Sequence, residues 1–396
     1  MNKRYDRRLF LARSTRVVGG LTIASSLPAV LWGCGDDDDS TAGTSAGTSA
    51  GTAAGTTTAG TVAGTTTAGT APGTTAGTTA TTTAGTVGGE PGTVGTQTNW
   101  VPDIEWAAWY LAEENGHFAK YNVTSKLAHG GPNTPAAVQL LAAGDGNVGI
   151  SSGELDIIRA NAEGSDYVII AAMYQRNPLG LTWMKGTKIN SAADLVGKRI
   201  GGPQGDNVTF EAVLKINKLP LDYTYVPMSF DPQPLVDGEM DVIISYVTNQ
   251  PISLRLQGHE VEAKPYSDFG LPSYGDILFA SKAWIADNRD LLVRYLAGLL
   301  LGVDDNRADP KAAIPLLVEK YGSDTEIDVD YATAAGPEYI KLMDSDFTDK
   351  NGLLSVDPDK MKNEVLPGLK AAGNTDLPTV DELLDVSIMK DAHALG

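Results

Sequence analysis

Cysteine, histidine and basic side chains are scarce in this sequence of 396 residues. With one cysteine and four histidines, the chain has no material for an internal disulfide and little for a Cys/His zinc site, so we expect no metal. Lys and Arg number 30 against 49 Asp and Glu, which gives a formal net charge of −19. Because nucleic-acid binding depends on basic side chains, we expect no nucleic-acid partner.

Large apolar side chains are almost absent between residues 34 and 98, where Thr, Ala and Gly repeat. Such a segment cannot bury enough apolar surface to offset the entropy lost on ordering, so we expect a flexible linker over 34–98. The globular part is expected to begin at residue 99.

Residues 1–33 carry six basic side chains and one acid before a short apolar run that ends at Trp32. This pattern is typical of a cleavable export signal, and the apolar run is too short for a comfortable membrane span. The run RRLFL at 7–11 resembles the twin-arginine signal. LWGC at 31–34 resembles a bacterial lipobox, which implies lipidation of Cys34, although a buried core cysteine is the alternative. We therefore expect a lipoprotein anchored to the cell membrane on its extracytoplasmic or periplasmic side.

From residue 99 onward, short apolar runs alternate with segments of helical periodicity, which predicts an α/β fold with largely parallel sheets. The segment Asp290–Val303 is apolar but short and contains charges, so we expect a packed helix rather than a membrane span. The expected strands are Asn99–Pro102, Ser125–Ala128, Val148–Ile150, Tyr167–Ala172, Leu181–Met184, Arg199–Gly201, Tyr223–Met228, Val242–Tyr246 and Ile277–Ser281, and the expected helices are Glu105–Glu114, Pro135–Ala143, Leu155–Ala162, Asn207–Ile216 and Pro234–Asp237.

Several stretches between Trp100 and Ser281 are similar to known sequence motifs, in the same order. They are WVP at 100–102, WYLAEENGHF at 109–118, NPLGL at 177–181, SAADLVGKRIG at 191–201 and LVDGEMDV at 235–242. In this order they resemble the substrate-binding proteins of bacterial ABC transporters for thiamine pyrimidine precursors, nitrate, sulfonates and taurine.

The resemblance implies a two-lobed periplasmic-binding-protein-like fold (type II), with two mixed sheets flanked by helices and a ligand held between the lobes. Lobe I is expected over 99–182 and 276–396, and lobe II over 183–275. The chain crosses between them near Leu181–Lys185 and Pro272–Ile277. Ligand contacts to both lobes then favour a closed state, and no chemistry is required.

Ligands of open α/β folds bind beyond the carboxyl ends of strands, so aromatic and polar side chains at those positions are candidates. Stacking on aromatic rings and hydrogen bonding to carboxyl or amide groups suit a flat nitrogen heterocycle better than a bare anion. Trp100 and Trp106 have ordinary core packing as an alternative, and Asp206 has capping of the following helix. The candidates are Trp100, Asp103, Trp106, Ser152, Glu154, Tyr174, Gln204, Asp206, Tyr246, Asn249 and Tyr274.

Catalysis is not expected. Some eukaryotic enzymes of the thiamine-precursor branch consume one of their own histidines, but the alignment on Tyr110–Ala112 places Trp106 at that position. Their cysteine-rich motif is also missing, and no Gly-x-Ser-x-Gly elbow is present. We therefore expect no catalytic residue and no cofactor.

The sequence thus predicts a monomeric, lipid-anchored receptor that delivers a small heteroaromatic nutrient to an ABC permease. A thiamine pyrimidine precursor is the favoured ligand, and riboflavin, a related flavin, taurine or another sulfonate are alternatives. A sensory surface receptor on the same fold is the competing hypothesis.

Overall fold

The computed structural model describes residues 88–396. The export signal, the lipobox with Cys34 and nearly all of the expected linker lie outside the described residues. No helix within 88–396 is both long and apolar enough to cross a membrane.

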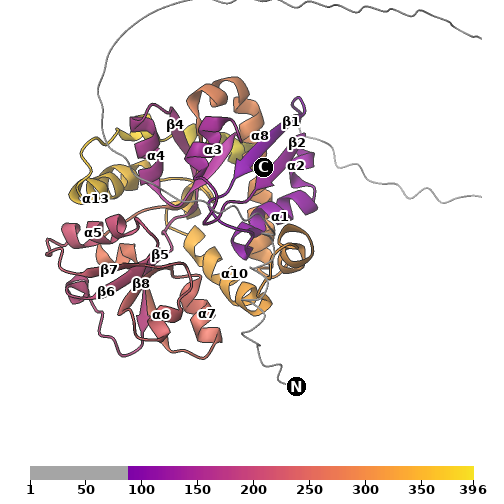
Figure 1. Cartoon of the computed structure of the whole chain (residues 1–396). Helices are drawn as coiled ribbons and strands as arrows, with labels where there is room; N and C mark the ends of the chain where they lie inside the picture. The colour runs from indigo at the N-terminus through magenta and orange to yellow at the C-terminus, as the bar shows by residue number, and fades with distance from the viewer. Residues whose placement is uncertain (1–87) are drawn as a thin grey trace, which may run out of the picture. The chain divides into compact units, whose positions relative to one another are not determined.

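Two five-stranded mixed sheets organise the chain (Figure 1). Sheet A contains, in spatial order, β2 (Val123–Ala128), β1 (Gly92–Gln97), β3 (Val148–Ser151), β10 (Gly275–Ser281) and β4 (Tyr167–Tyr174). Sheet B contains β7 (Thr224–Pro227), β6 (Arg199–Gly202), β8 (Val242–Tyr246), β5 (Leu179–Met184) and β9 (Val261–Pro265).

In each sheet, one strand runs antiparallel to its neighbours and comes from the far side of a chain crossover. β10 enters sheet A between β3 and β4, and β5 enters sheet B between β8 and β9. We call residues 88–174 and 275–396 lobe I and residues 179–265 lobe II. The two crossovers, 175–178 and 266–274, join them.

Helices cover both faces of sheet A. One face packs on α1 (Ala107–Glu114), α2 (His117–Lys120), α8 (Lys282–Ala308), α10 (Val329–Met343) and α15 (Val386–Leu395), and the other on α3 (Ala137–Ala143), α4 (Glu154–Ala162), α13 (Leu366–Ala371) and α14 (Val380–Leu383). Short elements complete lobe I: η1 (Ile104–Trp106), α9 (Ile314–Leu316), η4 (Leu317–Tyr321), α11 (Thr348–Asn351), α12 (Pro358–Lys360) and η5 (Met361–Val365).

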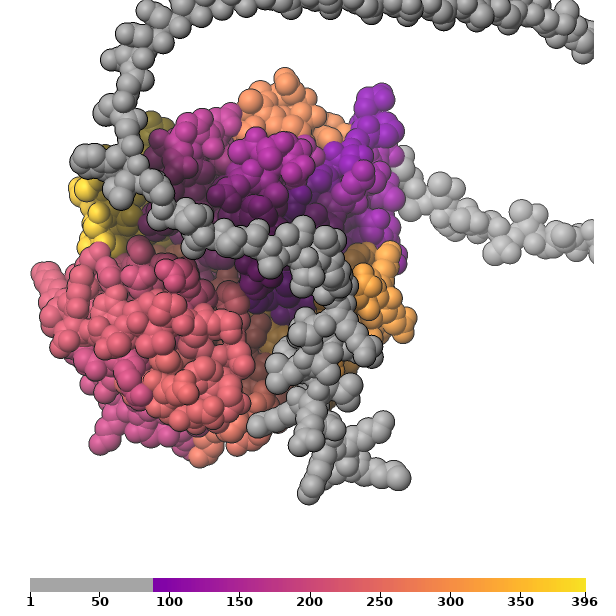
Figure 2. Space-filling view, viewed as in Figure 1, coloured from indigo at the N-terminus to yellow at the C-terminus, as the bar shows by residue number. Residues whose placement is uncertain are grey.

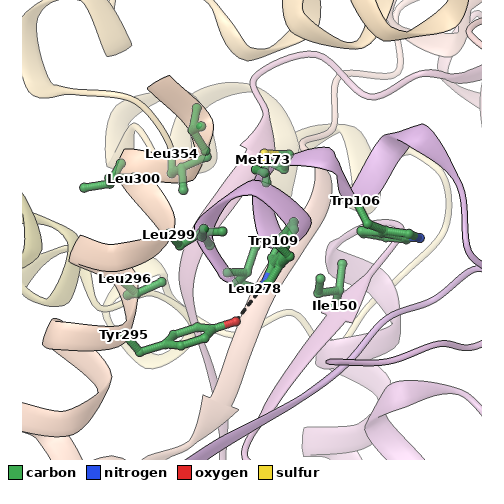
Figure 3. Packing of buried hydrophobic residues seen from close by; sticks show 14 of the residues in the cluster. Trp106, Trp109, Ile150, Met173, Leu278, Tyr295, Leu296, Leu299, Leu300 and Leu354 are labelled. Carbon is green, nitrogen blue, oxygen red and sulfur yellow. Dashed lines mark hydrogen bonds between the residues drawn. The ribbon is translucent and has the colours of Figure 1, made fainter. Parts of the chain in front are cut away.

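The first of these faces holds the largest cluster of buried side chains (Figure 3). Trp109 of α1 donates its Nε1 hydrogen to Tyr295 of α8 at 2.7 Å, and both side chains are buried. The apolar segment Asp290–Val303 lies inside α8 and packs on α1, which confirms the expected packed helix.

Sheet B is covered more lightly. η2 (Ala192–Leu195), α5 (Asn207–Ile216) and η3 (Tyr266–Phe269) pack on one face, and α6 (Gln233–Val236) and α7 (Gln250–Leu256) on the other. α13 of lobe I contacts α5, and α10 contacts α7, so the lobes meet at two places (Figure 1).

Two expectations about strands are wrong. The first strand is Gly92–Gln97 rather than Asn99–Pro102, so folded structure begins inside the segment expected to be linker. Its Thr- and Gly-rich sequence resembles the preceding repeat, and it is a strand because β2 and β3 pair with it on both sides. Val261–Pro265 forms a strand that the sequence did not predict. It lies at the edge of sheet B, where charged side chains and a proline are tolerated.

The first crossover also differs from expectation. β5 pairs with sheet B along its whole length from Leu179, so the chain passes between lobes at 175–178 rather than near Leu181–Lys185. Leu181 and Trp183 are consequently buried in the core of lobe II. The second crossover, 266–274, overlaps the predicted Pro272–Ile277 only at 272–274, because Gly275 already begins β10.

Candidate functional site

A cavity of about 580 Å³ lies between the two lobes and is lined by residues of both. Lobe I contributes the loop after β1 and the start of α4, while lobe II contributes the ends of β6 and β8 and the start of α5. Figure 2 shows lobe II, in pink to salmon, against lobe I in indigo, magenta and yellow. The cavity is within the size range of small-molecule sites.

Six of the candidate binding residues line this cavity. They are Trp100, Ser152, Glu154, Asp206, Tyr246 and Asn249. All follow or end strands, or begin helices, as the ligand-binding loops of an open sheet do.

Five candidates do not line the cavity. Trp106 is fully buried and donates its Nε1 hydrogen to the Val101 carbonyl at 2.9 Å, while Tyr174 stacks on Tyr339 with ring centroids 5.6 Å apart. The Tyr274 hydroxyl accepts a hydrogen bond from the backbone N–H of Asp357 at 3.0 Å. Trp106 is therefore a core residue, which is the alternative that its sequence position left open.

Asp103 and Gln204 also point away from the cavity. Asp103 is buried, accepts the backbone N–H of Ile104 and receives the Tyr331 hydroxyl at 3.3 Å, so it caps η1. Gln204 lies on an exposed turn. Position after a strand does not decide whether a side chain points to the cavity or back into the core.

A buried group of polar side chains forms the lobe I wall. Asn99 donates from Nδ2 to Ser152 Oγ and to Asp276 Oδ1, both at 3.0 Å. Glu105 lines the cavity beside them, and its Oε1 is buried and without a partner among the described residues. Asp276 adopts φ of 43°, a left-handed conformation that is rare for side chains with a Cβ and is found at functional sites.

Burial sets the protonation of this group. Loss of hydration raises the pKa of Glu105 well above its usual range, and the neighbouring Asp276 charge raises it further. Burial also raises the pKa of Asp276 to about 6, although the hydrogen bond from Asn99 opposes the shift.

The crossovers are held by Asn177 and Glu154. Asn177 Nδ2 donates to the carbonyls of Ser152 and Tyr274, both at 2.7 Å, and thereby ties the two crossovers to the lobe I wall. Glu154 accepts the Tyr274 N–H at 2.8 Å and the Ser273 hydroxyl at 2.7 Å. Glu154 thus lines the cavity, but its carboxylate is already satisfied by the second crossover.

Aromatic and hydroxyl contacts join the lobes at the cavity. Trp100 of lobe I meets Phe230 of lobe II edge to face, with ring centroids 4.6 Å apart and an interplanar angle of 76°. Tyr331 of α10 lies 3.4 Å from the Thr248 carbonyl of lobe II. These contacts define an arrangement in which the lobes are closed on each other.

Four residues lining the cavity carry a buried polar atom that no described residue partners. They are Asn99 (Oδ1) and Glu105 (Oε1) from lobe I, Gln250 (Oε1) from lobe II, and Tyr266 (hydroxyl) from the second crossover. Buried polar atoms in folded proteins nearly always have a partner, so each exception calls for an explanation. A ligand that donates hydrogen bonds to both sides of the cavity would supply it.

A family model described as NMT1/THI5 like matches residues 103–313, which is more than half of the chain. The chain belongs to this family. The match spans both lobes and includes Glu105, Asn177 and Asp276.

Two curated relatives of this NMT1/THI5-like chain are named as binding proteins for small molecules. It is 26% identical over 235 residues to the riboflavin-binding protein RibY of Chloroflexus aurantiacus, covering 56% of this chain and 64% of that one. It is 26% identical over 236 residues to the formylaminopyrimidine-binding protein of Halalkalibacterium halodurans, covering 57% and 70%. The chain thus matches slightly less than two thirds of the riboflavin-binding protein.

Solved structures show the fold. The ligand-binding component of an ABC-type import system from Staphylococcus aureus superposes with a TM-score of 0.56 at 15% identity, covering 76% of this chain and 98% of that one. A Candida albicans protein described as having the generic periplasmic binding protein fold gives 0.51 at 12% identity, covering 74% and 96%. The expected two-lobed fold with two mixed sheets is confirmed.

Sequence patterns missed several residues of the cavity in this NMT1/THI5-like protein. Glu105 reads as an ordinary acid in the first turn of a helix, and Asn99 lies in what was predicted to be a strand. Gln250 and Tyr266 lie in segments with no binding signal, and Phe230 follows a short strand. These residues are recognised as part of the site only in the structure, by their partnerless polar atoms or by the Trp100–Phe230 contact across the lobes.

Proposed function

We propose that this chain is the solute-binding protein of an ABC importer and captures a small heteroaromatic nutrient between its lobes. Lipidation at Cys34 would hold it on the extracytoplasmic face of a membrane. The family membership and the names of the curated relatives support this function.

The observation that carries the proposal is the set of partnerless polar atoms on both sides of the cavity. Asn99 on one side and Gln250 on the other each offer an amide oxygen. A ligand that satisfies both stabilises the closed arrangement over any open one, because only closure brings the two side chains to the same molecule.

The polar wall favours an aminopyrimidine as ligand. The Glu105 carboxyl, whose pKa burial raises well above its usual range, has a partnerless oxygen, and the neighbouring Asn99 oxygen accepts from an amino group. An amino group adjacent to a ring nitrogen provides matching donors and an acceptor. Trp100, Phe230 and Tyr246 supply aromatic surface around the same space.

A flavin is the second candidate, and one observation favours it. The cavity volume of about 580 Å³ leaves room for more than one ring. A sulfonate is disfavoured, because the carboxylates of Asp156 and Asp206 line the cavity and repel an anion.

The test is direct binding to the full chain, solubilised in detergent, by calorimetry and thermal denaturation. The probes are a formylaminopyrimidine, a hydroxymethyl-aminopyrimidine, riboflavin and taurine. A bound probe at 100 times its Kd should raise the free energy of unfolding by about 2.7 kcal/mol.

A variant pair then locates the site. Glu105→Ala should weaken binding of the heteroaromatic probe about tenfold or more, because it leaves buried polar partners unsatisfied. Glu163→Ala, which removes an exposed glutamate at the end of α4, is the matched control and should bind as the unaltered chain does. Preference for taurine, or unchanged affinity in Glu105→Ala, would contradict the proposal.

A further inference from the structure

A second group of polar side chains lies in the cavity, apart from Asn99 and Glu105. Asp156 on α4 of lobe I and Asp206 at the start of α5 of lobe II both line it. Asp156 accepts the Ser151 hydroxyl at 3.2 Å, whereas the Asp206 carboxylate accepts no hydrogen bond from residues 88–396. Carboxylates from both lobes thus line the same cavity.

Asp206 is not used as a helix cap. It occupies the N-cap position of α5, but its backbone is helical, with φ of −72° and ψ of −13°, and its side chain makes no capping bond. The sequence-based alternative of a cap is therefore not realised. Burial raises the pKa of Asp206 to about 6, and the Asp156 charge contributes to the shift.

Tyr266 provides an independent sign of a ligand at this place. Its side chain is 4% exposed, it lines the same cavity, and its hydroxyl is without a partner among the described residues. Burial raises the pKa of Tyr266 well above its usual range, and the Asp206 charge raises it further. A buried hydroxyl without a partner carries a desolvation cost that a ligand group would remove.

The two carboxylates and the Tyr266 hydroxyl determine which kind of ligand substituent can bind here. Carboxylates accept hydrogen bonds from O–H and N–H groups and repel phosphate or sulfonate. The N-terminus of a ten-residue helix such as α5 would otherwise favour an anion. Asp206, placed at that terminus, reverses this preference.

Two basic side chains also line the cavity and do not cancel this effect. Lys215 is paired with Glu211 on its own helix at 3.4 Å. Arg159 lies on α4 near Asp156; burial raises the pKa of Asp156, and the Arg159 charge only partly opposes this shift. No basic side chain of residues 88–396 forms an ion pair with Asp206.

We propose that Asp206, together with Asp156 and Tyr266, forms a second subsite that takes a hydroxylated or aminated substituent of the ligand and rejects its phosphorylated form. The inference rests on the proposed function and adds a selectivity to it. A phosphorylated nutrient then requires hydrolysis of its phosphomonoester before this protein captures it.

The experiment compares two pairs of probes on the full chain by calorimetry. One pair is riboflavin and riboflavin 5′-phosphate, and the other is hydroxymethyl-aminopyrimidine and its phosphate ester. The unaltered chain should bind the unphosphorylated member of the accepted pair at least about 30-fold more tightly, since a like charge facing a partner costs several kcal/mol.

Asp206→Asn should reduce this discrimination at least about tenfold, chiefly by improving the affinity for the phosphorylated probe. Asp222→Asn removes the same charge from an exposed site of lobe II and should leave the ratio unchanged. Tyr266→Phe should weaken the unphosphorylated probe a few-fold, because it removes one hydrogen bond.

The outcomes separate the two proposals. If an unphosphorylated probe binds but its phosphate ester binds equally well, the second subsite is wrong and the proposed function stands. The same holds if Asp206→Asn and Asp222→Asn change the ratio alike. If none of the four probes binds the unaltered chain, both proposals are overturned.

Discussion

Lobe I and lobe II share one strand order but differ in what they bury. In both sheets three parallel strands are followed by the strand that returns from the other lobe and then by an edge strand. Within lobe I, four carboxyl side chains are less than a tenth exposed, namely those of Asp103, Glu105, Glu154 and Asp276. No Asp or Glu of lobe II is buried to that degree among the described residues.

Packing follows the same division. Sheet A lies between helices on both faces and includes the largest apolar cluster, whereas sheet B is covered by short helices and two smaller clusters. Burying a carboxyl group costs free energy unless hydrogen bonds offset it, and a heavily packed lobe tolerates this cost better than a light one. Lobe I therefore holds the polar groups in fixed positions, and lobe II supplies a wall that closes on them.

The largest expected effect concerns the lobe I core. Trp106→Ala should lower the free energy of unfolding by about 3–5 kcal/mol, because it removes a fully buried indole. Urea denaturation measures this loss. Trp106→Phe, which keeps an aromatic ring in the core, should retain the ligand affinity. A tenfold loss of affinity in Trp106→Phe would place this side chain in the site after all.

The next effect concerns the cost of buried charge in lobe I. Burial raises the pKa of Asp103 from its usual 3.8 to about 6. The folded chain therefore holds this proton more tightly than the unfolded chain. The resulting stabilisation is fully present below about pH 3.8 and is lost as the pH rises through about 6.

Asp103→Asn remains neutral and keeps an oxygen for the N–H of Ile104. Relative to the unaltered chain, it should gain roughly 2–3 kcal/mol of stability between pH 4 and pH 8, as measured by urea denaturation at both pH values. Asp222→Asn, at an exposed aspartate of lobe II, is the control and should show no such gain. A gain of equal size in both variants would remove the distinction between the lobes.

The smallest effect concerns the contact between the lobes. Trp100→Ala and Phe230→Ala should each weaken ligand binding, because the edge-to-face pair stabilises the closed arrangement. A double-mutant cycle on Kd should give a coupling of about 0.5–1.5 kcal/mol. Additive effects of the two substitutions would mean that the rings do not meet in the ligand-bound protein.

Helical periodicity and apolar runs predicted most strands of the two sheets but fewer than half of the helices. α5 was expected at Asn207–Ile216 and lies there, since its buried side chains follow a clear helical spacing. β1 was misplaced because only Val94 among its residues is large and apolar. Its position is determined by pairing with distant strands, which local sequence does not encode.

The site was harder to predict than the fold. Trp100 and Tyr246 line the cavity while Trp106 and Tyr174 are buried behind it, although all four lie at similar places relative to predicted elements. The direction of a side chain after a strand depends on tertiary packing. Glu105 gains its role from Asp276, which is distant in the sequence, so no local pattern reveals the pair.

Closure of the two lobes on a ligand is tested most directly by a distance measured between them. Spin labels at Glu163→Cys in lobe I and Glu239→Cys in lobe II, both exposed positions, report this distance once Cys34 is replaced by Ser. Pulsed electron paramagnetic resonance should show a broad distribution without ligand that shortens and narrows with a saturating probe that calorimetry has shown to bind. An unchanged distribution with the probe bound would contradict capture by closure.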